Sequence, residues 1–450
     1  ANSHTGNNYL VGGTMELGSD AALSAVPGAA VADNLYLNGG TLRALESFTI
    51  NANRGITLGG EGGAFEVGSG MELAYAGTIA SEANYQNTTN GFLRTNAYNP
   101  DFGDLIKTGA GTLTLGGTTI NNTYTGMTHV MEGTLRIANT RTSENTTLTL
   151  GTHQSWTDGT IVESGASLEL NTGATWNTLE WITLKGEGFN GGGVVRTVGS
   201  NRTYRFDGQT FLEGTTRFNI TNSATLRLGE RGGGLASLDY DPATPDNILR
   251  QGSGELQFYS NSPDWYGSLI AVGGNTRLYN GAQLGGMTAL TLQRNAFFDI
   301  RYNSSSYDWF TDRLPDAMPV NLDGRSRFRF TTSGNYVYSG FETIGALTVT
   351  GGDPAIQFDT AMDLSASTPG TSLPSNNYGG LKFDSIVRTP GSILRFHQLD
   401  PMPQAWTYPA DVKSAVGAGW ADSTFGVSTF ADVITVAVGT APATIGGQLT

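Results

Sequence analysis

The 450-residue sequence contains no cysteine. This absence excludes disulfide bonds, thiolate metal sites and cysteine nucleophiles. Charge is also scarce, because only 14% of the residues are Asp, Glu, Lys or Arg, and the formal net charge is −14. A net negative charge disfavours binding to nucleic acid and to anionic lipid, since both attract basic proteins. We therefore expect no nucleic acid and no anionic membrane surface among its partners.

Long apolar runs and helical patterns are missing as well. No run of about 18 or more apolar residues occurs, so we predict no membrane-spanning helix in this chain. No charged segment followed by an apolar segment opens the chain. Because exported proteins lose their signal peptide, this does not argue for a cytoplasmic protein. Apolar residues do not recur at a 3.6-residue period between helix caps, so few segments are predicted to be helical.

Glycine and aromatic residues are plentiful, with 63 Gly, 20 Phe, 17 Tyr and 7 Trp. Glycine pairs separate short segments in which polar and apolar residues alternate, a pattern that predicts half-buried strands. Four clear examples are Thr112–Leu115, Thr134–Ile137, Ser167–Leu170 and Thr225–Leu228. This alternation predicts that Leu side chains point inward and that Thr and Arg side chains point outward.

One segment occurs twice. Residues 105–115, LIKTGAGTLTL, align with residues 248–258, ILRQGSGELQF, and the similarity continues to residues 137 and 278. The aligned pairs include Lys107 with Arg250, Gly109 with Gly252, Gly111 with Gly254, Tyr124 with Trp265, and Gly126 with Gly267. Short strands that follow recurring glycine corners predict a β-solenoid, in which each coil contacts only its neighbours.

The glycines after Lys107 do not form a nucleotide site. The sequence Gly109-Ala-Gly111 is followed by Thr114 where a dinucleotide fingerprint requires glycine, and a strand follows where both phosphate motifs require a helix. We therefore predict that Gly109 and Gly111 are repeat corners and that Lys107 points outward from its strand.

The stretch KTGAGTLTL, followed by NNTYTGMTHVMEGTLRI, resembles the autotransporter-associated β-strand repeat, also called the passenger-associated transport repeat. Segments on both sides, such as residues 54–67 and 381–396, are similar to segments of large exported bacterial repeat proteins. The resemblance implies a right-handed parallel β-helix, export from a bacterium, and a surface role as an adhesin, passenger or fibrous scaffold.

The predicted fold class is therefore all-β: an elongated right-handed parallel β-helix, or β-solenoid, with loop excursions. We expect residues 1–240 to form its N-terminal part, which contains the best-matching repeat at 105–137. Residues 241–450 are expected to continue the same solenoid, with longer loops and a terminal strand and tail at 430–450.

Candidate catalytic and metal-binding residues are few. The four histidines are scattered without metal-ligand spacing: His4, His129, His153 and His397. An acidic cluster in a proline-containing loop offers Asp239, Asp241 and Asp246 as calcium ligands, although loop carboxylates are more often solvated or bonded to turns. The signatures of pectin-degrading β-helix enzymes are absent. We predict a non-catalytic protein without a cofactor, with calcium at this cluster as a lesser alternative.

Aromatic residues in turn-rich segments are candidates for contact with glycans or with another subunit. They are Trp176, Trp181, Trp265, Tyr266, Trp309 and Phe310.

The ends of a solenoid expose unpaired strand edges, which must be capped or joined. Candidate joining strands contain Tyr9, Leu10 and Val11 near one end of the chain, and Val433, Ile434, Val436 and Val438 near the other. We therefore predict an extracellular structural protein at the cell surface that forms a head-to-tail homopolymer. An adhesin passenger that binds glycans or cell surfaces is the alternative, and a polysaccharide-active β-helix enzyme is a more remote one.

Overall fold

In the computed structural model, the regular secondary structure of the described residues is β-strand apart from two short 3-10 helices, which confirms the predicted all-β class. The structure describes residues 2–82, 103–117, 122–139, 145–146, 149–152, 159–173, 175–221, 223–238, 243–279, 281–302, 313–333, 340–361, 379–398, 434–438 and 441–445. The chain forms two compact units, one made of residues 1–278 with 282–287 and one of residues 279–281 with 288–450. The boundary expected at residue 240 stays a prediction.

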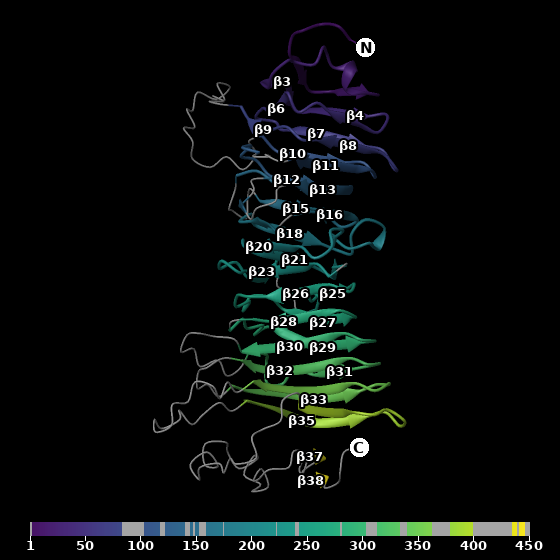
Figure 1. Cartoon of the computed structure of the whole chain (residues 1–450), viewed down its shortest axis with the longest axis vertical. Coiled ribbons are helices and arrows are strands. Elements are labelled where there is room, and N and C mark those ends of the chain that lie inside the picture. Colours follow the sequence, from purple (N-terminus) through teal and green to yellow (C-terminus); the bar gives the residue numbers. More distant parts are fainter. Residues whose placement is uncertain are drawn as a thin grey trace, which may run out of the picture. The chain divides into compact units, whose positions relative to one another are not determined.

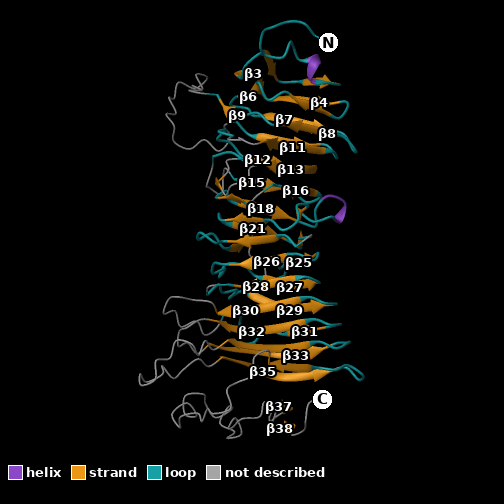
Figure 2. Ribbon diagram, in the orientation of Figure 1, coloured by secondary structure: helices purple, strands orange, loops and turns teal. Residues whose placement is uncertain are grey.

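The first unit contains four parallel sheets, which we call A, B, C and D (Figures 1 and 2). Sheet A consists of β1 (Asn8–Val11), β3 (Val31–Asn38), β6 (Arg54–Leu58) and β9 (Ile79–Ser81). Sheet B consists of β2 (Thr14–Leu17), β4 (Gly40–Ala44), β7 (Gly63–Val67), β10 (Leu105–Thr108), β12 (Thr128–Val130), β15 (Thr160–Val162), β18 (Ile182–Lys185), β21 (Thr210–Glu213) and β24 (Leu235–Ser237).

Sheets C and D complete this unit. Sheet C consists of β5 (Phe48–Ile50), β8 (Glu72–Tyr75), β11 (Thr112–Gly117), β13 (Gly133–Asn139), β16 (Ala166–Leu170), β19 (Val195–Thr197), β22 (Thr216–Asn219), β25 (Ile248–Gln251) and β27 (Gly267–Val272). Sheet D consists of β14 (Asn145–Thr146), β17 (Trp176–Thr178), β20 (Thr203–Phe206), β23 (Thr225–Leu228), β26 (Glu255–Phe258) and β28 (Asn275–Leu278). Two short 3-10 helices, η1 (Asp20–Ala22) and η3 (Phe189–Gly191), lie in loops.

From β4 to β26 the described strands follow the order sheet B, sheet C, then sheet A or D, except that no strand of A or D is described between β11 and β12. β27 on sheet C follows β26 without a strand of sheet B between them. One such circuit is a coil of the predicted parallel β-solenoid. Leu105 on β10 is in register with Thr128 on β12, and Thr128 with Thr160 on β15. These two coils take 23 and 32 residues, and most of the extra residues of the longer coil lie outside its strands.

The second unit is built in the same way from two parallel sheets and a hairpin. One sheet contains β29 (Met287–Gln293), β31 (Val320–Leu322), β33 (Gly340–Val349) and β35 (Gly379–Arg388). The other contains β30 (Phe297–Tyr302), β32 (Arg327–Ser333), β34 (Ala355–Ala361) and β36 (Arg395–Gln398). The antiparallel hairpin pairs β37 (Ile434–Val438) with β38 (Ala441–Ile445).

The register between strands of successive coils places residues of the same type above one another in the core. Leu113, Leu135 and Leu168 are successive partners on sheet C, and all three are at most 1% exposed. Burial of a leucine side chain contributes about 1.5 to 3 kcal/mol, so such columns are the main apolar contribution to stability. The prediction that Leu points inward in the alternating segments is confirmed.

The N-terminal loop of the first unit is held by one buried side chain. Arg54 is 0% exposed, and its Nε lies 2.8 Å from Asp20 Oδ1. Its Nη1 donates hydrogen bonds to Ser24 Oγ at 2.6 Å and to Asn34 Oδ1 at 2.9 Å. The guanidinium therefore fastens residues 20–24 to sheet A.

In the described part of the chain, no helix has the length and apolar character needed to cross a membrane.

Candidate functional site

The repeated segment places a buried lysine where the chain turns from sheet B to sheet C. Lys107 is 0% exposed, and its Nζ donates to three carbonyl oxygens: Thr108 at 2.7 Å, Gly109 at 2.7 Å and Glu132 at 3.0 Å. Glu132 belongs to the next coil, so the ammonium joins two successive coils. The prediction that Lys107 points outward is wrong, because it shares the inward face of β10 with Leu105.

Arg250 has the same role in the second copy. It is also 0% exposed, and its Nη1 donates to the carbonyl oxygens of Gly252 (2.6 Å) and of Gly273 on the next coil. A buried cation costs free energy unless it is hydrogen-bonded, and here the backbone carbonyls of the glycine corner supply the acceptors. The two basic residues therefore share a structural role that their sequence alignment does not reveal.

Glycine is required at this corner for two reasons. Gly133 has φ of 69°, which L-residues with a side chain rarely adopt. A Cβ at Gly133 would also overlap the carbonyl oxygens of Gly109 and Gly111 on the preceding coil. The glycines thus allow the close approach of backbone that brings carbonyls within reach of Lys107.

The two copies occupy different faces of the solenoid. Lys107 lies on β10 and precedes the turn from sheet B to sheet C, whereas Arg250 lies on β25 and precedes the turn from sheet C to sheet D. The repeat therefore encodes a corner together with its two flanking strands, and the same corner serves at different positions around a coil.

Tyr124 and Trp265, which are aligned in the two copies, are interior residues. Both are 0% exposed, and Trp265 Nε1 donates to the carbonyl oxygen of Asp246 at 2.7 Å. Tyr124 Oη is hydrogen-bonded to Thr128 Oγ1, and burial raises its pKa well above the usual value. The prediction that Trp265 contacts a ligand or another subunit is wrong, because its indole fills the core.

The other predicted aromatic contacts differ in position. Trp176 is 1% exposed and packs against Phe206 at 6.2 Å between ring centroids, so it is a core residue and the predicted external contact is wrong. Trp181 and Tyr266 are half-buried and reach the surface, so their proposed contact role stays a prediction. Trp309 and Phe310 lie outside the described residues.

The candidate calcium ligands are only partly described. Asp246 is 4% exposed, and its Oδ1 accepts a hydrogen bond from the Gly214 amide at 2.6 Å. Asp239 and Asp241 lie outside the described residues, so calcium at this cluster stays a prediction. No group of three or more His, Asp or Glu side chains that could hold a metal occurs in the ranges that the structure describes.

The outer faces carry columns of oppositely charged residues in register. On sheet C, Arg136 lies 3.0 Å from Glu72 and also contacts Glu169, and Glu169 lies 2.7 Å from Arg196. On sheet B, Arg43 lies between Glu16 and Glu66, at 2.8 and 2.9 Å. Pairs in which both side chains are exposed, such as Arg43 with Glu16, contribute little stability individually. The ion pairs do neutralise the charges of successive coils, so these faces of sheets B and C carry no large patch of positive or of negative charge.

The candidate joining strands are described in part. Tyr9 and Val11, on β1, are 62% and 69% exposed, whereas Leu10 is half-buried on the inward face. Ile434, Val436 and Val438 lie in β37, which pairs with β38, and Val433 lies outside the described residues.

Residues 105–137, which contain Lys107, Gly133 and Tyr124, match the family model of the passenger-associated-transport-repeat. The chain carries a passenger-associated transport repeat. No solved structure matches the chain. The resemblance to this repeat that the motif residues predicted is confirmed. The structure also gives a reason for one motif residue, because Lys107 of the transport repeat binds the carbonyl oxygens of its glycine corner.

A curated relative supports this relationship. The chain is 30% identical over 136 residues, 30% of its length, to the protein named "Adhesin BmaC autotransporter" from Brucella suis biovar 1 (strain 1330). The matched region spans only 3% of that protein's length. The transport repeat and this similarity together indicate a secreted or surface-exposed bacterial protein that resembles autotransporter passengers.

We expect Lys107→Met to lower the free energy of unfolding of the first unit by about 1 to 3 kcal/mol, because three buried carbonyls lose their donor. Lys107→Arg is the matched control. It should cost less than half as much, since Arg250 fills the equivalent corner. Urea denaturation followed by tryptophan fluorescence would measure both changes. Equal stability of wild type and Lys107→Met would contradict the proposed role.

Burial lowers the pKa of Lys107 to about 8 from its usual 10.5. Between these values the unfolded chain binds more protons than the folded chain, so the free energy of unfolding should rise with pH from about 8 to 10.5. The rise is at most about 3 kcal/mol, because the three carbonyl acceptors favour the ammonium form and oppose the effect of burial. Denaturation at several pH values should show it in wild type relative to Lys107→Arg. Parallel pH profiles for the two proteins would contradict this prediction.

Proposed function

We propose that this chain is a non-catalytic adhesive segment of a bacterial surface protein, in which the solenoid supports loops and side chains that contact other cells. The observation that carries the proposal is the similarity over 136 residues to a protein named as an autotransporter adhesin. Because this similarity covers a small part of that protein, adhesion by the present chain requires a direct test.

The use of ionisable groups in the first unit supports a non-catalytic role. Lys107 and Arg250 are bonded to backbone carbonyls, and Arg54 to a carboxylate and neutral oxygens. Catalytic acids and bases need access to a substrate together with a tuned pKa. These buried cations instead stabilise corners and a loop, and they have no exposed face that a substrate could approach.

A pair of aromatic side chains offers a contact surface on sheet B. Trp181 and Phe211 lie 5.6 Å apart between ring centroids, tilted at 48°, and both are half-buried. Half-exposed aromatic rings contribute large contact area at interfaces and stack on sugar rings. Trp181 directly precedes β18 and Phe211 lies on β21, the next strand of sheet B, so the solenoid holds both rings and they would meet a partner with little loss of conformational freedom.

Beads coated with the purified chain are expected to adhere to cultured animal cells more than beads coated with albumin. The double substitution Trp181→Ala and Phe211→Ala should reduce adhesion by about threefold or more, since a few aromatic residues carry most of an interface's energy. Tyr259→Ala, at another half-buried aromatic, is the matched control and should adhere like wild type. Adhesion no greater than that of albumin would contradict the proposed function.

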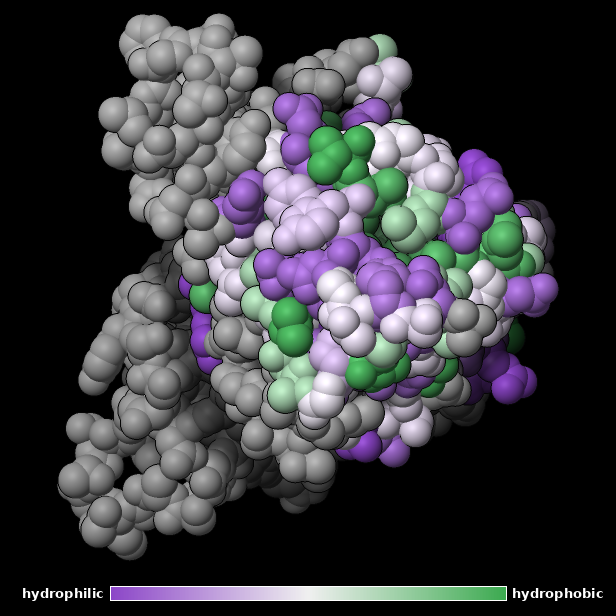
Figure 3. Space-filling view, turned by 90° about the horizontal axis from the view of Figure 1, so that it is seen from above, coloured by the Kyte–Doolittle hydropathy of each residue, from purple (hydrophilic) through white to green (hydrophobic). Residues whose placement is uncertain are grey.

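Head-to-tail self-association is a second candidate function, favoured by the first strand. β1 pairs with β3 along one edge, and its outward side chains Tyr9 and Val11 are strongly exposed. The surface at this end of the first unit mixes hydrophilic and hydrophobic residues (Figure 3). An edge strand with exposed apolar side chains favours addition of a further strand. We propose that a strand of a second copy, such as β37 or β38, adds at β1.

If β1 joins copies, sedimentation velocity should show assemblies that grow with protein concentration. Tyr9→Lys combined with Val11→Lys should abolish them, because charges on an edge strand oppose strand addition. Leu45→Lys, at an exposed apolar residue outside β1, is the control and should assemble like wild type. A monomer at every accessible concentration would exclude this second candidate.

A further inference from the structure

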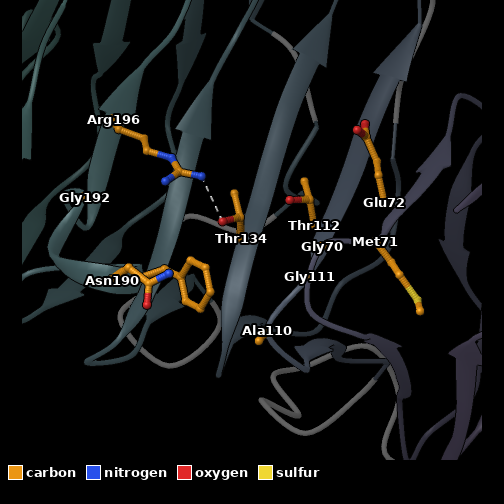
Figure 4. Close-up of a pocket in the computed structure, with 11 residues that line it drawn as sticks. Gly70, Met71, Glu72, Ala110, Gly111, Thr112, Thr134, Asn190, Gly192 and Arg196 are labelled. Atoms are coloured by element: carbon orange, nitrogen blue, oxygen red, sulfur yellow. Dashed lines mark hydrogen bonds between the residues drawn. The ribbon is translucent and has the colours of Figure 1, made fainter. Parts of the chain in front are cut away.

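A groove of about 380 Å³ lies on the first unit, where successive coils turn from sheet B to sheet C (Figure 4). Its wall includes Glu72, Thr112 and Thr134 from three successive strands of sheet C, and Arg196 from β19. The loop that contains η3 adds Phe189 and Asn190 at one side. The volume is within the range of about 300 to 1,000 Å³ that is usual for small-ligand sites.

The loop beside the groove is held by several hydrogen bonds. The amide of Phe189 donates to Ser167 Oγ at 2.9 Å, and Arg217 Nη1 donates to the carbonyl oxygen of Gly191 at 2.6 Å. Asn219 Nδ2 donates to the carbonyl oxygen of Gly192 at 3.1 Å. The loop is therefore anchored to two neighbouring coils, and this anchoring presents Phe189 and Asn190 in fixed positions.

The charged residues of the groove already have partners of opposite charge. Arg196 Nε lies 2.7 Å from Glu169. Arg196 Nη2 donates to Thr134 Oγ1 at 3.0 Å, and Figure 4 marks this hydrogen bond with a dashed line. Glu72 accepts a hydrogen bond from Thr114 at 2.6 Å and lies 3.0 Å from Arg136. A charged ligand would find no unneutralised counter-charge here. A ligand rich in hydroxyl groups would find donors and acceptors at Thr112, Asn190 and Arg196.

We propose that this groove binds a neutral oligosaccharide. Phe189 is half-buried, so part of its ring can stack on a sugar face, and the exposed amide of Asn190 can both donate and accept hydrogen bonds. The strands of the wall follow one another at about 4.8 Å, which resembles the length of one sugar residue, so a short glycan can lie across them. The inference deepens the proposed adhesive function and rests on it, because it names the class of surface molecule that the chain would recognise.

The test is calorimetric titration of the whole chain with three probes: N-acetylated chitotriose, maltotriose and an anionic heparin tetrasaccharide. Binding of at least one neutral trisaccharide is expected. Phe189→Ala should weaken it by about tenfold, since an aromatic stacking contact contributes up to about 1.5 kcal/mol. Asn190→Gly should weaken it by about threefold or more, since it removes one neutral hydrogen-bonding group.

Asn190→Gly is chosen because Asn190 has φ of 52°, a conformation that glycine adopts without strain. Asn201→Gly is its matched control, since Asn201 has φ of 53° and lies outside the groove lining. It should bind like wild type. Circular dichroism and thermal unfolding would confirm that each variant is folded.

Absence of binding to both neutral trisaccharides would overturn the inference, and so would binding that Phe189→Ala and Asn190→Gly leave unchanged. Binding of the heparin tetrasaccharide alone would overturn the neutral class. The bead assay separates this outcome from the proposed function. Adhesion without trisaccharide binding rejects the groove alone, whereas trisaccharide binding without adhesion rejects the adhesive function.

Discussion

Parallel pairing in register between one coil and the next is the interaction on which the rest of this structure depends. Most strands of the first unit have three to seven residues, too few to be stable as isolated pairs. Register places Leu113 on Leu135 inside and brings Arg136 to Glu72 outside. Since a shift of one residue would exchange the two faces, the apolar columns and the charged columns both select the same alignment.

The corners create the main difficulty for such a stack, because tight turns bring backbone carbonyls together in the interior. Lys107 and Arg250 supply donors to those carbonyls, and glycines such as Gly133 permit the close approach. A cation used in this way is unavailable to a substrate. Contact with partners is therefore proposed to depend on half-exposed aromatic residues and on anchored loops, which can vary without disturbing the register.

The loop at η3 illustrates how a solenoid can acquire a binding groove without changing its core. Its residues are held by side chains of two neighbouring coils, Ser167 and Arg217. Together with the corner residues of the transport repeat, this loop surrounds a concave surface whose charges are balanced. Surface recognition in this chain would then come from side chains that several coils bring together, such as Phe189 and Asn190 on one loop with Thr112 and Arg196 on other coils.

The sequence by itself determined the alternating strands, the glycine corners and the recurrence of residues 105–137 near 248–278, because these depend on local backbone preferences and a two-residue period. It also placed Tyr9 and Val11 in a strand. Only the tertiary structure decided that Lys107 and Trp265 face inward and that the η3 loop borders a groove. A charged side chain usually faces solvent, so the sequence favoured an outward Lys107. The carbonyl oxygens of the next coil that hold Lys107 and Arg250 inside lie 20 or more residues away in sequence.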